Sequence, residues 1–391
     1  AVKKEFEKNH FQIQHPPTFG VEYTVNNKKL VNIYKKPDFS TLAEEYTYES
    51  VNPLGMITEN SILTKWLQDK NKRKYKRLDF IPKEVELTEI YNTFTGWASD
   101  NWEDYPSKTE LDSDELEAVE TFINHIKLLV NYEEESYKYF INYIAHLFQK
   151  PEEKPLVAIL IKSVEGVGKD LLTEFIKNIL GKQYIKKTPN VNSILGNFQD
   201  DLSQKLIVQF DELEGADGFK VKEKLKHLIT CVDQTINPKG KTPFEETSYV
   251  RVIIYSNNIT PISISQTDRR YIVFQSGDTQ EKEYYDNLVS ILHNKKYLRA
   301  IHDYFLYNID ISNFSPIIRP ETQAYRDMKK SNLSPVFGFL YDEFKGDDWK
   351  DTFEDEYKIH PKTKDILISS TTIYNNFKYY LQSKGQENMN F

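Results

Sequence analysis

The sequence of 391 residues has little of what marks secreted, zinc-binding and membrane proteins. It has one cysteine, Cys231, which excludes a disulfide framework and any zinc site built from several cysteines. Its apolar runs, such as 156–161, reach only about six residues, whereas a membrane-spanning helix needs about 20. The N-terminus has no charged-then-apolar segment typical of a signal peptide. These absences predict a cytoplasmic location, in a reducing compartment, without a membrane partner.

The net charge is −8 at pH 7, and charged residues make up 28% of the chain. A negative net charge argues against a protein that binds nucleic acid over much of its surface. Local basic patches, rather than the net charge, decide such contacts. Lysine and arginine concentrate in two stretches, 65–77 and 220–241. A charged stretch is also what an ordinary solvated surface looks like, so both interpretations stay open at this point.

Changes in texture along the chain divide it into predicted domains. Residues 1–109 form an irregular N-terminal or connector region with short strand-like pieces, such as 20–25 and 29–34. We expect this region to follow a segment upstream of Ala1. Residues 110–150 form a helical collar, because apolar residues recur there at three- and four-residue spacing. Residues 151–311 form the core, and residues 312–391 form a helical C-terminal segment.

Within the core, buried strands alternate with helices, which predicts an α/β fold with a largely parallel sheet. Continuous apolar runs are typical of strands that are buried on both faces. The strands are expected at 156–161, 206–210, 249–256 and 271–274, and the helices at 169–180 and 284–307. Toward the C-terminus we expect helices at 335–344 and 371–384, separated by a loop at 347–364.

A glycine-rich loop joins the first of these strands to the helix at 169–180. Its sequence, SVEGVGKD over 163–170, partly matches the phosphate-binding pattern G-x-x-x-x-G-K-[ST], in which backbone N–H groups at a helix N-terminus bind phosphate oxygens. Gly166 and Gly168 would let the backbone approach the phosphates. Lys169 would reach the β- and γ-phosphates, so the loop predicts an ATP site.

Two positions of the loop depart from the pattern. Ser163 stands where the first glycine belongs, and Asp170 stands where a serine or threonine would hold Mg²⁺. A carboxylate at 170 can bind the ion directly or through water, but it also repels phosphate. Taken alone, the loop is therefore also consistent with a chance glycine-rich turn.

Further polar residues follow in order, each next to a predicted strand. Asp211 would hold Mg²⁺ through water, and Glu212 would orient and deprotonate the attacking water. Asn257 would contact both the γ-phosphate and that water. Arg270 would reach into the site of a neighbouring subunit. The ordinary alternatives are a solvated strand end, a turn and a surface ion pair, but the complete ordered set favours an ATPase.

At this point the sequence resembles a superfamily 3 helicase, and more closely the primase-helicase proteins of phages, plasmids and large DNA viruses. The resemblance covers about 85–290 and is weak at the ends. The stretches that carry it, besides the loop, are 91–96 (YNTFTG), 143–151 (YIAHLFQKP), 195–198 (LGNF), 206–212 (LIVQFDE), 225–230 (LKHLIT), 238–241 (PKGK), 256–258 (SNN) and 269–271 (RRY).

The resemblance implies an AAA+-like P-loop ATPase core that forms hexameric rings and translocates on single-stranded DNA, with ATP and Mg²⁺ as cofactors. A viral or phage protein of this type works in the cytoplasm of the host cell. The segment from 371 onward resembles the start of a winged helix, which stops before it is complete. No primase motif is visible. Any primase or polymerase domain is therefore expected upstream of Ala1 or in a partner protein.

The resemblance also implies roles for individual residues. Lys169 matches the Walker lysine, Asp211 and Glu212 the Walker B pair, Asn257 the sensor, and Arg270 the arginine finger. Lys239 and Lys241 match a hairpin that tracks DNA in the ring channel. Without the family, two lysines at an exposed turn still suit phosphate contact, which needs charge rather than base-edge shape.

Two other functions stay open beside the helicase. One is a P-loop ATPase that loads or remodels a replication complex. The other is a non-catalytic DNA-binding module with a degenerate phosphate loop, which Asp170 favours and the ordered acidic, amide and arginine residues oppose.

Overall fold

The structure, a computed structural model, describes most of the chain. The described residues are 2–25, 28–85, 87–189, 194, 200–212, 215–237, 243–258, 261–262, 264–265, 267–331, 333, 335–344, 349–353, 357–363 and 365–383. In this part, no helix is long and apolar enough to cross a membrane.

The chain divides into two compact units. The larger unit comprises residues 1–262 and 269–322, and the smaller unit comprises residues 263–268 and 323–391. The predicted boundaries fell at 109, 150 and 311. The collar and core predicted as separate therefore lie in one unit, together with the N-terminal region.

The sequence predicted an irregular N-terminal region, but the structure has regular strands and helices in this part of the larger unit. A four-stranded sheet with the order β3-β2-β1-β6 lies there, and Phe6, Phe39 and Trp66 are buried in a core of their own. The predicted strand-like pieces at 20–25 and 29–34 are confirmed. The other elements are too short to show a period in the sequence. The elements are α1 (Val2–Asn9), β1 (His10–Ile13), β2 (Thr18–Val25), β3 (Lys28–Tyr34), α2 (Lys36–Leu42), β4 (Thr47–Val51), β5 (Ile57–Ser61), α3 (Ile62–Gln68), β6 (Lys74–Tyr75), β7 (Arg77–Asp79) and β8 (Ile90–Asn92).

A five-stranded sheet in the larger unit has the order β10-β11-β14-β9-β15, and every neighbouring pair is parallel. The predicted parallel sheet is thus confirmed. Because parallel strands run in one direction, the carboxyl ends of all five meet at one edge. The strands are β9 (Ala158–Lys162), β10 (Ile185–Thr188), β11 (Ile207–Asp211), β14 (Arg251–Ser256) and β15 (Tyr271–Gln275).

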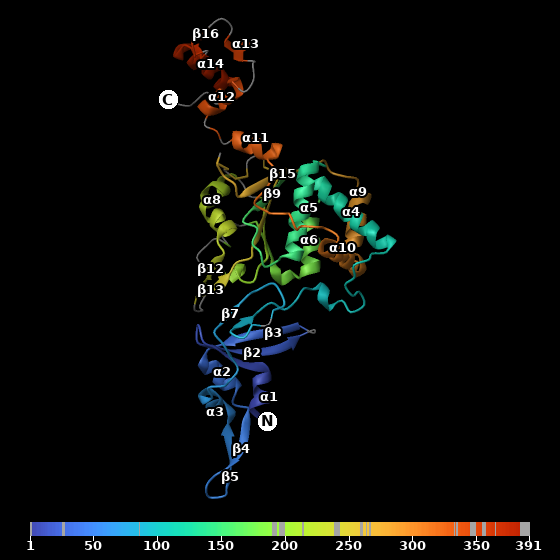
Figure 1. The fold of residues 1–391 in the computed structure, drawn as a ribbon, viewed down its shortest axis with the longest axis vertical. Coiled ribbons are helices and arrows are strands. Elements are labelled where there is room, and N and C mark those ends of the chain that lie inside the picture. The colour runs from blue at the N-terminus through green and yellow to red at the C-terminus, as the bar shows by residue number, and fades with distance from the viewer. Residues whose placement is uncertain are drawn as a thin grey trace. The chain divides into compact units, whose positions relative to one another are not determined.

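Helices cover this sheet on both sides (Figure 1). α5 and α6 lie on one side together with α4, α9 and α10, and α8 lies on the other. The elements around the sheet are η1 (Ser99–Asn101), α4 (Ser113–Leu129), α5 (Glu134–Gln149), α6 (Lys169–Leu180), η2 (Lys182–Tyr184), η3 (Asp200–Leu202), α8 (Gly215–Thr230), β12 (Asp233–Ile236), β13 (Phe244–Thr247), α9 (Lys282–Leu292) and α10 (Lys295–Tyr307).

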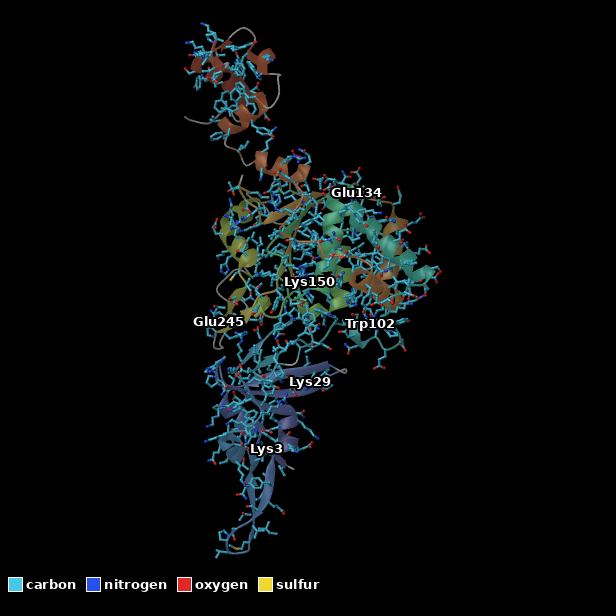
Figure 2. All side chains as sticks on the ribbon, in the orientation of Figure 1. Lys3, Lys29, Trp102, Glu134, Lys150 and Glu245 are labelled. Carbon is cyan, nitrogen blue, oxygen red and sulfur yellow. The ribbon has the colours of Figure 1, made fainter. Side chains whose placement is uncertain are left out.

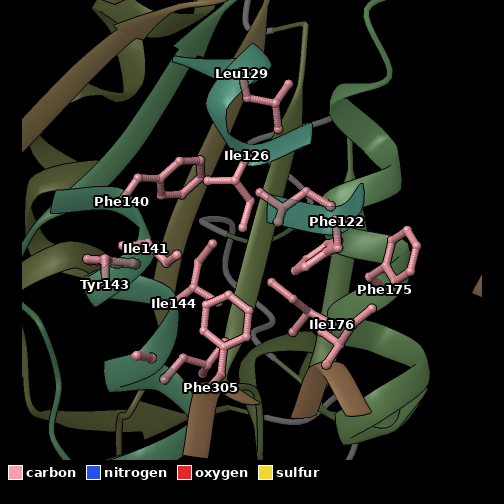
Figure 3. Packing of buried hydrophobic residues seen from close by; sticks show 14 of the residues in the cluster. Phe122, Ile126, Leu129, Phe140, Ile141, Tyr143, Ile144, Phe175, Ile176 and Phe305 are labelled. Atoms are coloured by element: carbon pink, nitrogen blue, oxygen red, sulfur yellow. The ribbon is translucent and has the colours of Figure 1, made fainter. Parts of the chain in front are cut away.

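The main hydrophobic core lies between the sheet and these helices. Figure 3 shows Phe122 of α4, Ile144 of α5 and Phe175 of α6 packed together, with Phe305 of α10 beside them. The predicted helical collar exists as α4 and α5, but the apolar faces of both helices are buried in the same core as the sheet. α4 begins at a capping box, in which the Asp112 side chain accepts a hydrogen bond from the Glu115 backbone N–H.

The single helix predicted over 284–307 is wrong, because the structure has two helices there. α9 ends at Leu292 and α10 begins at Lys295. The Asn294 side chain accepts a hydrogen bond from the Lys296 backbone N–H at 2.9 Å, which caps a new helix N-terminus. This capping residue interrupts a run whose apolar spacing continues through the break.

The smaller unit has its own core of Phe339, Trp349, Phe353, Phe377 and Leu381. The predicted helices at 335–344 and 371–384 are confirmed by α12 and α14. The predicted loop at 347–364 is wrong, because it contains a short helix and a strand that pairs with a second strand at 366–368. The elements are α11 (Gln323–Ser331), α12 (Pro335–Phe344), α13 (Trp349–Phe353), β16 (Tyr357–Ile359), β17 (Ile366–Ile368) and α14 (Ser370–Ser383).

Figure 2 adds the described side chains to the ribbon of Figure 1. Charged residues such as Lys29 and Glu134, which Figure 2 labels, are exposed, as expected for a chain that is 28% charged.

Candidate functional site

The glycine loop follows β9 directly and runs into the N-terminus of α6. The Ser163 backbone N–H donates to the Ser256 carbonyl oxygen at 3.0 Å, which ties the start of the loop to the end of β14. Gly166 and Gly168 have φ values of +78° and +85°, in the left-handed region that favours glycine. The first backbone N–H groups of a helix have no partner within the helix, so they are available to an anion.

Lys169 and Asn257 are brought together at this edge, although 88 residues separate them. The Lys169 Nζ donates to the Asn257 side-chain oxygen at 2.8 Å. Lys169 is the first residue of α6, and Asn257 follows the last residue of β14. The predicted lysine and the predicted sensor therefore share one place in the fold.

Asp170 and Asp211 also lie together, because two other side chains join them. The Gln209 Nε2 donates to Asp170 Oδ1 at 2.9 Å and to Asp211 Oδ1 at 2.6 Å. The Lys187 Nζ lies 2.6 Å from Asp170 Oδ1 and 3.6 Å from Asp211 Oδ2. We call these four residues the carboxylate quartet. The sequence predicted the two aspartates but not the lysine or the glutamine.

Burial raises the pKa of the Asp211 carboxyl above its ordinary value, while Gln209 and Lys187 act in the opposite direction. Burial lowers the pKa of the Lys187 ammonium, but its hydrogen bond to Asp170 and the two nearby carboxylates outweigh burial and raise it. The quartet therefore holds the positively charged Lys187 near two carboxyl groups, those of Asp170 and Asp211.

The residues at this edge fit a magnesium ion held jointly with phosphate. Mg²⁺ in nucleotide sites is commonly bound by one or two carboxylates together with phosphate oxygens and water. Asp170 and Asp211 supply two carboxylates. No cluster of three or more His, Cys, Asp or Glu suited to a metal occurs among the residues that the structure describes. Two carboxylates at this edge suit a site that phosphate oxygens and water complete.

Glu212 follows β11 at the same edge. Its backbone has φ +52°, and its N–H donates to the Tyr255 carbonyl oxygen at 3.0 Å. A left-handed conformation is uncommon for a residue with a side chain and is often found at functional sites. The exposed Glu212 side chain stands next to Asp211, where the sequence predicted a pair of acids.

Arg270 is not brought to this edge. It precedes β15, and its carbonyl oxygen accepts a hydrogen bond from the Ala158 N–H at the start of β9. Both positions are at the amino ends of parallel strands. β15 ends at Gln275, so five residue steps, about 17 Å, separate Arg270 from the carboxyl end of this strand. Within this chain, Arg270 therefore lies at the opposite edge from the glycine loop.

Lys239 and Lys241 lie outside the described residues, as do Pro238 and the stretch 195–198. The strands that flank the predicted hairpin are present. β12 pairs with β13 in the antiparallel sense, with Ile236 opposite Phe244. These two strands are those of a hairpin, and the placement of its lysines stays a prediction.

His125 of α4 supports the glycine loop from behind, and the sequence did not single it out. Its Nε2 lies 2.9 Å from the Gly168 carbonyl oxygen, and its Nδ1 lies 3.2 Å from the Tyr284 hydroxyl. Because a carbonyl only accepts, the proton is on Nε2, and Tyr284 donates to Nδ1. Burial lowers the pKa of His125 to about 4, so the ring is neutral at pH 7.

A histidine inside an apolar helix face is usual in a core, so nothing in the sequence distinguished His125. The space around Gly168 shows how close the support is. A Cβ at position 168 would lie 2.9 Å from His125 Cε1 and 3.0 Å from Tyr285 Cε1. The loop is thus packed against α4 and α9, and its backbone is held by the helical layer.

Comparisons with known proteins agree with this architecture. Residues 161–270, which run from the end of β9 to Arg270, match a family of unknown function, DUF5906. The DNA primase-polymerase of Nitratiruptor phage NrS-1 is 30% identical over 226 residues, covering 55% of this chain and 30% of the phage protein. The chain therefore spans less than a third of that relative's length.

Solved structures of the NrS-1 C-terminal region are similar in fold. An A-form apo structure of that region superposes with a TM-score of 0.65 and 20% identity, covering 90% of this chain and 79% of the other. A second apo structure gives 0.62 and 18%, covering 90% and 84%. The chain is thus similar in sequence to part of a phage DNA primase-polymerase, and it shares the mixed α/β fold of that protein's C-terminal region.

Proposed function

We propose that this chain is the motor part of a replication protein of a phage or another mobile element, an ATP-dependent DNA helicase. One observation carries the proposal: the glycine loop, the Lys169–Asn257 contact and the carboxylate quartet meet at the carboxyl edge of a parallel sheet. Ligands of open α/β sheets bind at this edge. The similarity to a phage DNA primase-polymerase supports replication as the setting. The host cytoplasm is then the place of action.

Each residue at the edge has a chemical task in this proposal. Lys169 and the loop N–H groups bind the β- and γ-phosphates of ATP. Asp170 and Asp211 hold Mg²⁺, which when bound neutralises phosphate charge. Glu212 takes the proton of the attacking water, and Asn257 orients that water. Ser163 takes the place of the first glycine of the pattern. It is buried, and its backbone N–H connects the start of the loop to the end of β14.

The proposal includes a ring of identical subunits, which we expect to be a hexamer. Arg270 lies at the opposite edge of its own sheet, so it can serve an ATP site only in a neighbouring subunit. The lysines of the β12–β13 hairpin, Lys239 and Lys241, would then contact single-stranded DNA in the channel. A primase or polymerase domain, in the same protein or as a partner, would complete the machine.

The test is the ATPase rate of the chain with and without single-stranded DNA, together with strand separation on a forked duplex. We expect DNA to stimulate hydrolysis and hydrolysis to drive strand separation. Lys169→Ala should lower the rate by about 10²-fold or more, because it removes a cation that stabilises phosphate charge. Lys177→Ala, on the same helix and paired only with Glu174 in the described contacts, is the matched control.

Three results would contradict the proposal. Hydrolysis without strand separation would favour an ATPase that loads or remodels a replication complex. DNA binding without any hydrolysis would favour a non-catalytic DNA-binding module. A Lys169→Ala rate equal to that of the Lys177→Ala control would remove the glycine loop from the chemistry.

A further inference from the structure

The acid at position 170 creates a charge problem that the quartet addresses. A serine or threonine at this position of the phosphate loop is neutral, whereas Asp170 brings a negative charge next to the place of an anionic ligand. Asp211 adds a second negative charge within reach of the same Gln209 amide. Two carboxylates and a triphosphate repel one another unless a cation lies between them.

Lys187 lies where such a cation is needed, and the sheet fixes its position. β10 and β11 are parallel neighbours in which Lys187 is the register partner of Gln209. Residues i and i+2 of a strand share a face, so Asp211 is on the same face as Gln209. Side chains of paired residues in adjacent strands lie side by side. The strand pairing thus directs the ammonium of Lys187 toward Asp170 and Asp211.

The contacts divide the Asp170 carboxylate into two halves. Oδ1 accepts from both Lys187 Nζ, at 2.6 Å, and Gln209 Nε2, at 2.9 Å. Neither contact uses Oδ2, and the Asp170 side chain is half exposed. One oxygen is therefore anchored by the sheet, and the other has no hydrogen bond among the contacts of the described residues. Gln209 is fully buried, and its Oε1 has no hydrogen-bond partner within the described residues. Its side chain is held through Nε2, which donates to both acids.

We propose that Asp170 and Lys187 act as a pair that replaces the neutral hydroxyl of the usual phosphate loop. The ammonium cancels the charge of the carboxylate and anchors Oδ1, and Oδ2 is left to bind the metal of Mg²⁺·ATP. Lys187 is then a positioning residue, acting through Asp170. This inference rests on the proposed ATP site, and it adds a specific partner for the residue that departs from the pattern.

The test measures affinity for Mg²⁺ with a fluorescent, non-hydrolysable ATP analogue, so that turnover plays no part. Lys187→Met, which keeps most of the side-chain length and removes the charge, should weaken binding about tenfold or more, because it leaves a carboxylate uncompensated. It should also raise the Mg²⁺ concentration needed for half-maximal binding. Lys187→Arg keeps the charge and should stay within about threefold of the wild type.

The decisive variant is the double change Asp170→Thr with Lys187→Met. It restores the neutral hydroxyl of the pattern and no longer needs a compensating cation, so affinity should return to within about threefold of the wild type. Lys186→Met is the matched control. Lys186 is next along β10, on the opposite face, and bonds Asp201 instead, so its loss should leave affinity unchanged.

Several outcomes would overturn the inference. Tighter Mg²⁺-dependent binding by Lys187→Met would mean that the lysine competes with the metal. Unchanged affinity in Lys187→Met would mean that Lys187 and Asp170 form an ordinary surface ion pair. A double variant as weak as Lys187→Met, or a Lys187→Arg as weak as Lys187→Met, would make its role one of shape rather than charge. Binding by the wild type alongside any of these results leaves the proposed function standing, whereas no binding by the wild type overturns both.

Discussion

Gly168 meets two separate demands that only glycine satisfies together. Its φ of +85° is a conformation that residues with a Cβ rarely adopt, and the space for a Cβ is taken by His125 and Tyr285. Gly166 shares the first demand, with φ +78°, but a Cβ there would meet only Thr279 Cγ2 at an ordinary 3.4 Å. Substitution of Gly166 therefore introduces backbone strain alone, whereas substitution of Gly168 introduces both backbone strain and a steric clash.

We predict that Gly168→Ala destabilises the protein more than Gly166→Ala. Both changes should lower the free energy of unfolding by about 1–2 kcal/mol through the left-handed backbone. Gly168→Ala should lower it further, because the new methyl group pushes against buried rings. Urea unfolding followed by circular dichroism measures both. Equal losses would show that the loop moves away from His125 at little cost.

Buried histidines give the residue scale a second consequence, in the dependence of stability on pH. Burial lowers the pKa of His125 to about 4 and that of His302 to about 3. Burial, followed by the charge of Arg251, lowers the pKa of His146 to about 4. Between the ordinary value of 6.5 and these values, the unfolded chain binds protons that the folded chain does not. Stability must therefore fall as the pH falls through this window.

We predict that the urea midpoint decreases between pH 6.5 and pH 4.5, with each such histidine contributing up to about 1.4 kcal/mol per pH unit. His302→Gln should make this dependence shallower, because it removes one of the groups. The exposed His293, changed to Gln, is the control. A pH dependence that is the same in both variants would show that His302 becomes protonated without unfolding.

At the scale of elements, the β12–β13 hairpin is an insertion between α8 and β14 rather than part of the sheet. Its strands pair only with each other within the described sheets, and its predicted tip carries Lys239 and Lys241. A hairpin of this kind can change its tip without changing the core. Its lysines are therefore suited to a test of DNA contact that leaves the ATP site intact.

We predict that Lys239→Ala with Lys241→Ala weakens binding to single-stranded DNA and slows unwinding, while the ATPase rate without DNA stays nearly unchanged. When phosphate contacts are lost, DNA binding releases fewer counterions. The slope of log K against log salt should therefore flatten by about 1–2 units. Lys282→Ala with Lys295→Ala removes the same charge from α9 and α10. An equal flattening in that control would assign the effect to net charge rather than to the hairpin.

At the scale of the whole molecule, the two edges of the five-stranded sheet divide the proposed machinery. The glycine loop, Lys169 and the carboxylate quartet lie at the carboxyl edge, and Arg270 precedes β15 at the amino edge. If Arg270 serves an ATP site, a second subunit must supply it. Activity would then depend on assembly.

We predict that the ATPase rate per subunit rises with protein concentration and that Arg270→Ala binds ATP but loses turnover, on the order of 10³-fold. Mixing Arg270→Ala with Lys169→Ala should restore part of the activity, because some interfaces then pair an intact Lys169 with an intact Arg270. Absence of recovery in proven mixed assemblies, with a concentration-independent wild-type rate, would make Arg270 an intramolecular residue.

Local patterns were sufficient for much of the fold. The helix from Lys169 to Leu180 was predicted with the same bounds, because a glycine loop begins it and Gly181 follows it. The four predicted core strands were found within two residues at each end, because continuous apolar runs are distinctive. Short elements were missed: β10 has only four residues, and the N-terminal sheet lacks any long periodic run.

The sequence by itself determined which residues end up at the carboxyl edge, since a residue that follows a parallel strand must lie there. It determined Lys169, Asp170, Asp211, Glu212 and Asn257 in this way, and their roles stay predictions. Only the tertiary structure decided what surrounds them. Lys187 meets Asp170 because β10 pairs with β11, and His125 meets Gly168 because α4 packs behind the loop. Such contacts depend on the order of strands and the packing of helices, which are set by the burial of the whole core rather than by neighbours in sequence.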